Sequence, residues 1–335
     1  MRSGLHCLRV ILLPGLLAGL VGLGITGATA ADGWPTKPIL IVVGNPAGGP
    51  ADTIARLVTG GMAKTLGQPF IVEARPGGGT GGTIAMNAVF SAAPDGYTIG
   101  LGTSGPLGAG PALVKLPWDP PKDFTAISQI SEGTFLLGVS TSLGVDTVQE
   151  LIAKVRVNPG RYNYGSDGIG SSTHLGFELF KIRAGGLDVV HIPYKGSSEK
   201  NASMLAGEIH LFLNSPSKVV DGMIADGKIK AVAVTSPRRL ADLPNVPTME
   251  EAGLPGVDAR SWFGLVAPKG LPADIVERLN QAAVAALQQP EVIAGLKTLG
   301  QNAHPGTPAE LTQLMTDANR QWREVVEKAN IKVDN

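Results

Sequence analysis

Apolar runs and helically spaced apolar positions alternate along the first third of the chain. A continuous apolar run at 39–44 contains several β-branched residues, a pattern typical of a strand covered on both faces. Apolar residues then recur at the spacing of one helix face between 54 and 66. Strands at 69–73 and 97–103, with a helix at 81–92 between them, complete a predicted βαβαβ unit.

The same alternation returns in the second half of the chain, without a fixed-period repeat of the sequence itself. Helices are predicted at 147–158, 172–184, 197–206 and near 217–226, and strands at 162–166, 188–193, 208–214 and 228–236. A further strand is predicted at 260–267, followed by amphipathic helices. Thr307-Pro308-Ala309-Glu310 is a capping box with proline at the first helical position, which predicts the start of a long final helix.

Two such units predict an α/β protein of two lobes, each a doubly wound sheet flanked by helices, joined by a hinge. The chain is expected to cross between the lobes near 127–132 and near 235–238, where one unit stops and the next begins. Lobe 1 is therefore predicted to be discontinuous. It would comprise 31–129 and 237–335, and lobe 2 would comprise 130–236.

The N-terminal segment has a different character from the rest of the chain. Arg2 and Arg9 give it a positive start, residues 10–25 are apolar, and Ala28-Thr29-Ala30 supplies small residues for cleavage. This pattern predicts a secretory signal peptide over 1–30. The alternative, an N-terminal membrane anchor, is disfavoured because the apolar run is short and small residues close it.

Composition and charge exclude several kinds of partner. The chain has 28 Lys plus Arg against 28 Asp plus Glu, and loss of Arg2 and Arg9 with the signal peptide would leave 26 against 28. A nearly neutral protein has no net field with which to recruit nucleic acid or an anionic membrane surface. Its 43% hydrophobic content can fill a sizeable core. Cys7, the single cysteine, would leave with the signal peptide, which suits the oxidising bacterial periplasm.

A glycine-rich loop follows the first predicted strand and precedes a helix. Ala47, Gly48 and Gly49 carry almost no side-chain bulk, and glycine can adopt the positive φ that turns successive N–H groups toward a ligand. Loops at the carboxyl ends of strands, next to helix N-termini, are where α/β units bind anions. We therefore expect a carboxylate here. Asp52 is expected to support the loop, as a helix-start residue paired with Arg56.

The second unit offers a counterpart between its first strand and the following helix. Its candidate ligand-binding residues are Ser166, Gly168, Gly170, Ser171 and Ser172. Either loop alone could be an ordinary turn from strand to helix. Because the two loops occupy corresponding places in the two units, we expect them to face each other across a cleft. Each would then hold one end of a small organic acid.

Other candidates lie at the predicted edge of the cleft. Ser104 and Gly105 end the third strand of the first unit, Tyr194 follows a strand of the second unit, and Asn214 ends another. Tyr194 could equally belong to an ordinary strand-to-helix turn. His174, in the first turn of a helix, is more consistent with packing or capping than with catalysis.

Enzyme signatures are missing from the sequence. There is no G-x-S-x-G motif, no G-x-G-x-x-G motif in either glycine loop, and the run GGGTGG lacks the P-loop lysine. The five histidines are scattered without metal-ligand spacing. We therefore expect no catalytic residue, no metal and no cofactor.

Several short motifs occur in a fixed order across the mature chain: WPTKPI at 34–39, AGGPAD at 47–52, LGQPF at 66–70, PDGYT at 94–98, HIPYKG at 191–196 and LPNVPTMEEAG at 243–253. Together they resemble the Bug-type receptors, the periplasmic substrate-binding proteins of tripartite tricarboxylate transporters. The resemblance runs from Trp34 to about Ile331. Each motif is modest, but the set is highly specific.

The resemblance implies a two-lobed periplasmic binding protein, type II-like, whose hinged cleft closes on a carboxylated ligand. It implies that backbone groups of two strand-to-helix loops, here 47–49 and 166–172, recognise a carboxylate, partly through water. It also implies a membrane-embedded transporter pair as partner, with ion-coupled uptake. Asn214 stands where the family frequently has aspartate. This favours hydroxy acids, dicarboxylates or an aromatic acid over an amino acid as ligand.

The sequence thus predicts a monomeric periplasmic solute receptor that binds a small carboxylate and catalyses nothing. Two alternatives stay open. One is a secreted enzyme that acts on a carboxylated substrate with Ser166, His174 or Asp52. The other is a sensory receptor that signals ligand occupancy to a membrane kinase.

Overall fold

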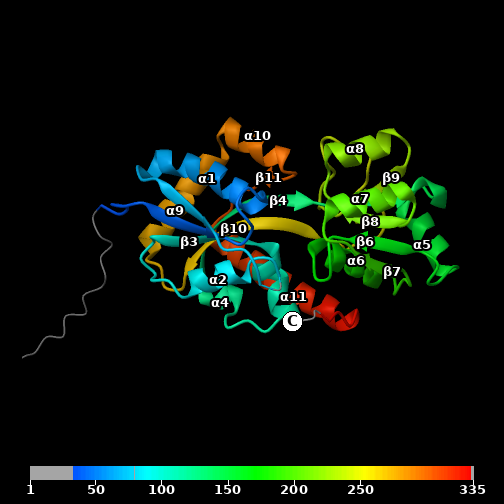
Figure 1. Ribbon diagram of the computed structural model, residues 1–335, viewed down its shortest axis with the longest axis horizontal. Coiled ribbons are helices and arrows are strands. Elements are labelled where there is room, and N and C mark those ends of the chain that lie inside the picture. Colours follow the sequence, from blue (N-terminus) through cyan, green and yellow to red (C-terminus); the bar gives the residue numbers. More distant parts are fainter. Residues whose placement is uncertain (1–32, 79, 333–335) are drawn as a thin grey trace, which may run out of the picture.

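The computed structural model describes residues 33–78 and 80–332. The predicted signal peptide and Cys7 lie outside the described residues. Two lobes lie side by side, and each is a mixed sheet flanked by helices (Figure 1). The predicted two-lobed α/β fold is therefore confirmed.

The sheet of the first lobe has the strand order β11-β4-β10-β3-β1-β2. Its strands are β1 (Ile39–Val43), β2 (Phe70–Ala74), β3 (Thr98–Thr103), β4 (Phe124–Thr134), β10 (Arg260–Pro268) and β11 (Asn302–Ala303). Strand β1 is parallel to β2 and β3, whereas β10 runs antiparallel to both β3 and β4. The carboxyl ends of β1 to β4 therefore meet at one edge of the sheet, which faces the second lobe.

The sheet of the second lobe has the order β7-β6-β8-β5-β9. Its strands are β5 (Leu136–Ser140), β6 (Asn163–Ser166), β7 (Val190–Pro193), β8 (Leu211–Asn214) and β9 (Ile229–Val234). Strand β5 leads away from the first lobe and is antiparallel to β8 and β9, while β6 is parallel to β7 and β8. The carboxyl ends of β6, β7, β8 and β9 consequently point back toward the first lobe.

Helices cover both faces of each sheet. In the first lobe, one face carries α1 (Pro50–Leu66), α9 (Ala273–Leu287) and α10 (Pro290–Thr298), and the other carries α2 (Thr83–Phe90). The short helices α3 (Gly110–Leu113) and α4 (Pro120–Asp123) lie in the connection from β3 to β4, and Ala112 and Leu113 of α3 pack against the core of the second lobe. In the second lobe, α5 (Val148–Arg156) and α6 (Ser172–Arg183) cover one face, and α7 (Ser197–Ala206) and α8 (Lys218–Ala225) cover the other. Short η1 (Ser104–Ala109) and η2 (Thr141–Leu143) follow β3 and β5.

The chain passes directly from one sheet to the other. Only Phe135 separates β4 from β5, and the return runs from the end of β9 to the start of β10. The sequence pattern did not predict β4 and β5 as strands, because apolar and polar residues alternate poorly in the run FTAISQISEGT of β4. In the structure, the pairing of β4 with β10 is itself irregular, with shifts of register. The lobe boundaries at 129/130 and 236/237 stay predictions.

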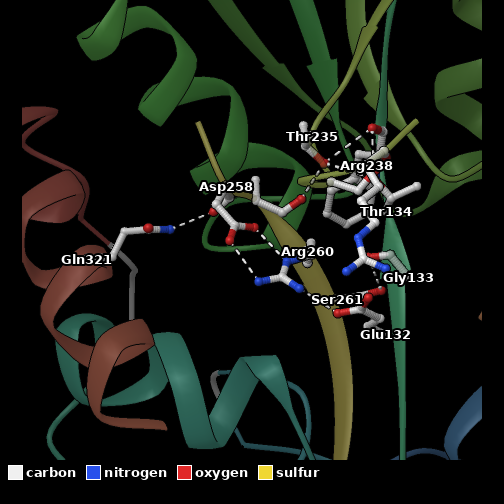
Figure 2. A network of polar contacts seen from close by, with 12 residues as sticks. Glu132, Gly133, Thr134, Thr235, Arg238, Asp258, Arg260, Ser261 and Gln321 are labelled. Carbon is white, nitrogen blue, oxygen red and sulfur yellow. Dashed lines mark hydrogen bonds and ion pairs between the residues drawn. The ribbon is translucent and has the colours of Figure 1, made fainter. Parts of the chain in front are cut away.

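Thr235 ties the outgoing and the returning segments together. Its buried hydroxyl accepts the N–H of Phe135 (3.0 Å) and donates to the carbonyl of Ala259 (2.5 Å). The N–H of Thr235 donates in turn to the carbonyl of Phe135 (2.8 Å). Figure 2 shows this group at the junction of the two lobes. The hinge is thus a hydrogen-bonded unit rather than two independent strands.

The final helix, α11 (Pro308–Lys328), connects both lobes. The predicted capping box is present at its start, between Thr307 and Glu310. Leu311 belongs to the core of the first lobe, whereas Trp322 belongs to the core of the second. The helix runs along one side of the molecule from the first lobe toward the second (Figure 1). It is a third link between the lobes, besides the two strand crossings.

We expect Trp322→Ala to destabilise the protein by about 3–5 kcal/mol, because it removes a large side chain that is 5% exposed and leaves a cavity. The free energy of unfolding from urea denaturation measures this change. Arg323→Ala, at an exposed position of the same helix, is the control and should change stability by less than about 0.5 kcal/mol. Equal stability of the two variants would mean that α11 does not link the cores.

Candidate functional site

The two glycine loops lie at the facing edges of the two sheets, after β1 and after β6. The structure brings two of the predicted site residues into contact across the lobes. The Oγ atoms of Ser104, after β3, and Ser172, at the start of α6, are 3.5 Å apart. Ser104 and Ser172 therefore lie where the two lobes meet.

In the first loop, Asp52 braces the chain. Gly48 has a φ of +78°, and its N–H donates to Oδ2 of Asp52 (3.0 Å). Arg56 binds the same carboxylate through two hydrogen bonds of 2.9 and 3.0 Å and holds the pKa of Asp52 below its usual value. The N–H of Gly49 donates to the carbonyl of Pro46 (2.9 Å). The supporting role predicted for Asp52 is confirmed, and the glycine amides are occupied within the loop.

Some donors of the first lobe remain unpaired next to the loop. The N–H groups of Ala51 and Asp52 stand in the first turn of α1, which begins after the N-cap Gly49. Throughout the described chain, no residue accepts a hydrogen bond from either group, nor from the N–H of Ala47. The first turn of a helix also carries a partial positive charge. The free donors at this edge of the sheet therefore include the helix start as well as the loop.

The second loop is ordered in the same way. Ser166 is fully buried, and its hydroxyl accepts the N–H of Gly168 (3.2 Å). The N–H of Gly170 donates to Nδ1 of His174 (3.0 Å), and Ser171 caps α6 by accepting the N–H of His174 (3.2 Å). These contacts fix the loop from inside. They leave the N–H groups of Ser172 and Thr173, in the first turn of α6, without an acceptor among residues 33–78 and 80–332.

A buried ion pair supports the second loop, and the sequence analysis missed it. Lys200 of α7 has a side-chain exposure of 0%, and its Nζ lies 2.8 Å from Oδ1 of Asp167. It also donates to the carbonyl of Leu213 (3.0 Å). Burial lowers the pKa of Lys200, and the carboxylate of Asp167 opposes that shift. Thr173 and Ser197 donate hydroxyl hydrogen bonds to the same carboxylate.

The acidic residue of each glycine loop is thus neutralised by a basic residue. Arg56 pairs with Asp52 in the first lobe, and Lys200 pairs with Asp167 in the second. Without these partners the two carboxylates would repel an anionic ligand. The local field at the cleft is therefore governed by the two helix starts and by the hydroxyls of Ser104 and Ser172.

Three further predicted residues make packing contacts or hydrogen bonds within the protein. A Cβ at Gly105 would lie 2.4 Å from the carbonyl oxygen of Thr80, so this position needs glycine for close packing. The N–H of Tyr194 donates to the carbonyl of Ser166 (3.0 Å). The side-chain amide of Asn214 donates to Oδ1 of Asn201 (2.5 Å). Whether each also touches a ligand stays a prediction.

Four rings stack behind the second loop. Tyr164 lies between Phe177 and His191, with centroid distances of 3.8 and 4.8 Å, and His174 stacks on His191 at 4.0 Å. Burial lowers the pKa of both histidines to about 4, so both are neutral at pH 7. The packing and capping role predicted for His174 is confirmed. His191, which the sequence analysis did not single out, contacts Oγ of Ser166 through Nε2 (2.7 Å).

The contact between Ser166 and His191 resembles a nucleophile with its general base, but its setting is different. A serine nucleophile must reach a substrate, whereas Ser166 is 0% exposed and its hydroxyl is engaged with the loop. The geometry assigns this pair to ordering the second loop.

Two further findings concern metal binding and membrane spanning by the described residues. Within 33–78 and 80–332, no three His, Cys, Asp or Glu side chains are grouped so that they could hold a metal ion. In the same part of the chain, every helix is too short or too polar to cross a membrane.

Two α/β lobes whose facing sheet edges each carry a glycine loop followed by a helix start have the architecture of two-lobed periplasmic binding proteins. The model of the Tripartite tricarboxylate transporter family receptor matches residues 54–331, and the chain belongs to that family. The BugT protein of Bordetella pertussis is 32% identical over 312 residues, which cover 92% of this chain and 94% of BugT. The predicted membership among Bug-type receptors is confirmed.

Two solved structures of relatives contain organic acids. An R. palustris protein solved with adipate is 33% identical, with a TM-score of 0.71, covering 89% of this chain and 99% of its own. MatC from Rhodopseudomonas palustris, with bound malate, is 34% identical, with a TM-score of 0.69, covering 88% of this chain and 100% of its own.

The stacked histidines make stability depend on pH. Their folded pKa of about 4 lies below the ordinary value of 6.5, so between these values the unfolded chain binds more protons than the folded one. We expect the free energy of unfolding to fall by about 2–4 kcal/mol between pH 7 and pH 5, measured by urea denaturation.

The variants His174→Gln and His191→Gln should each remove part of this loss. His304→Gln is the control, because Glu132 raises the pKa of His304 and its contribution has the opposite sign. An unfolding free energy that is flat between pH 7 and pH 5 in the wild type would contradict the neutral stack.

Proposed function

We propose that this chain is a periplasmic receptor that binds a small carboxylate between its lobes and delivers it to the membrane subunits of a tripartite tricarboxylate-type transporter. The single observation that carries the proposal is the pair of helix starts, α1 and α6, one from each lobe, that follow strands ending at the facing sheet edges and keep unpaired donors. Family membership supports the transporter as partner. The predicted signal peptide over 1–30 supports export to the periplasm.

Ligand recognition follows from this arrangement. One carboxylate accepts N–H groups from the first turn of α1, and a second polar end accepts from the first turn of α6 and from the hydroxyls of Ser104 and Ser172. A hydrogen bond to a charged group contributes about 1.5–3 kcal/mol. Four to six of them, less the cost of ordering, reach the roughly 8 kcal/mol of a micromolar complex. The proposed site keeps the residues predicted from the sequence, with Ser104 and Ser172 as side-chain donors to the ligand and the others as its frame: Ala47, Gly48, Gly49, Asp52, Gly105, Ser166, Gly168, Gly170, Ser171, Tyr194 and Asn214.

Dicarboxylates are the ligand class that the site supports best. The relatives solved with adipate and with malate are bound to acids of this class. The two acidic residues of the loops are already neutralised by Arg56 and Lys200, and the amide of Asn214 is engaged with Asn201. None of these groups is a spare carboxylate for an ammonium ion. A dicarboxylate therefore suits the cleft better than an amino acid.

We propose further that the chain acts as a monomer and catalyses no reaction. The buried Ser166, the capping His174 and the braced Asp52, which an enzyme would need, are each used to order a loop. A sensory receptor would bind ligand in the same way and differ only in its membrane partner. Pull-down with candidate transporter subunits or a membrane kinase distinguishes the two.

Calorimetry of the mature protein with mono-, di- and tricarboxylates tests the proposal. We expect a dicarboxylate to bind with 1:1 stoichiometry, to raise the melting temperature and to be recovered unchanged. Ser104→Ala and Ser172→Ala should each weaken binding about tenfold, the loss of one hydrogen bond to a charged group.

Ser91→Ala is the matched control and should bind as the wild type does. Ser91 is exposed and lies between the end of α2 and the start of β3, at the edge of the first sheet that faces away from the second lobe. Unaltered affinity in both cleft variants would overturn the assigned site. Turnover of the acid would instead favour the enzyme alternative.

A further inference from the structure

A cavity lies at the junction of the lobes, apart from the glycine loops. Its volume is about 310 Å³. It is bounded by the end of β4, the start of β10, the segment after β9, and β11. The lining residues are Glu132, Thr134, Ser236, Pro237, Arg238, Arg239, Leu240, Arg260, Asn302 and His304.

Strand order separates this cavity from the cleft described above. The glycine loops follow β1 and β6, which lie on the β3 side of β10 and on the β8 side of β5. The cavity lies at the opposite edges, beside β11 in the first sheet and β9 in the second. The pair of crossing segments, β4–β5 and β10, stands between the two. A molecule in this cavity would therefore occupy a different place from the cleft ligand.

Cations dominate the lining. Arg238, Arg239, Arg260 and His304 face a single lining carboxylate, Glu132. The charge of Glu132 is already used, because Oε2 pairs with Arg260 (2.5 Å) and Oε1 lies 3.6 Å from Nδ1 of His304. It therefore does not neutralise the remaining arginines.

Two of the three arginines are fixed by acids outside the cavity. Asp258 holds Arg260 through two hydrogen bonds of 2.6 and 2.7 Å. Glu251 holds Arg239 at 2.7 Å. The planar guanidinium groups are thus oriented before any ligand arrives, which reduces the entropy lost on binding.

Arg238 is different. Across the residues that the structure describes, its guanidinium has no ion pair and no hydrogen bond, and the residue is exposed at the mouth of the cavity that it lines. Its side chain extends from the segment after β9 toward Glu132 and Gly133 at the end of β4 (Figure 2). It leaves one uncompensated positive charge directed into the cavity.

We propose that this cavity is a binding site for a small oxyanion, of the carboxylate or phosphate type, held by Arg238 together with Arg260 and His304. Arg238 belongs to the segment that follows the second lobe's sheet, whereas Arg260 begins β10 and His304 directly follows β11, both in the first lobe. A bound oxyanion consequently bridges the lobes on the hinge side. It stabilises the arrangement in which the lobes meet, independently of what the cleft binds.

Thermal shift and calorimetry with inorganic phosphate and with acetate test this site, in a buffer free of both and at constant ionic strength set by chloride. We expect a saturable rise in melting temperature with one of the two anions, which identifies the ligand type. Arg238→Gln should weaken that binding at least tenfold, because it removes the charge and the bidentate contact.

Arg323→Gln is the matched control, since Arg323 is exposed on α11 outside the cavity, and it should keep the wild-type affinity. The double variant Ser104→Ala, Ser172→Ala should also keep it, which separates this site from the cleft. Equal affinity in the wild type and Arg238→Gln would overturn the proposal. So would an equal effect of chloride, or loss of binding in the cleft variant.

Discussion

A backbone N–H group buried at the start of a helix needs an acceptor from the protein, from water or from a ligand, since leaving it unpaired costs free energy, and this constraint acts where the lobes of this protein meet. The first turns of α1 and α6 keep unpaired N–H groups at the place where the lobes meet. The N–H groups of Gly48, Gly49, Gly168 and Gly170 are hydrogen-bonded locally. These bonds order the two loops next to the helix starts, and in the proposed function the ligand accepts the hydrogen bonds that the helix starts leave open.

The two frames are built by different means to the same effect. In the first lobe, a surface arginine one helical turn away neutralises Asp52. In the second lobe, the fully buried Lys200 neutralises Asp167, and a stack of four rings supports the loop from behind. Removing one member of a buried ion pair leaves an uncompensated charge, so the second frame is the more sensitive of the two.

The hinge combines flexibility with a fixed point. Two strand crossings and α11 connect the lobes, and Thr235 hydrogen-bonds both crossings together. The hydrogen bonds of Thr235 hold the outgoing and the returning segment together at the junction of the lobes. The arginine-lined cavity lies at the same junction, beside β11 and β9, whereas the glycine loops lie on the other side of the crossing strands.

The sequence by itself determined the alternation of strands and helices, the two-lobed fold, the capping box of α11 and the location of the loops at the cleft. These features depend on local spacing and on the rule that α/β units bind ligands at the carboxyl ends of strands. The sequence did not predict strands β4 and β5, because these strands pair with strands from distant parts of the chain. Only the tertiary structure showed that Lys200 pairs with Asp167, that His191 contacts Ser166, and that the N–H groups of the loop glycines form local hydrogen bonds. It did so because hydrogen bonds and ion pairs depend on distances between residues that the linear chain keeps far apart.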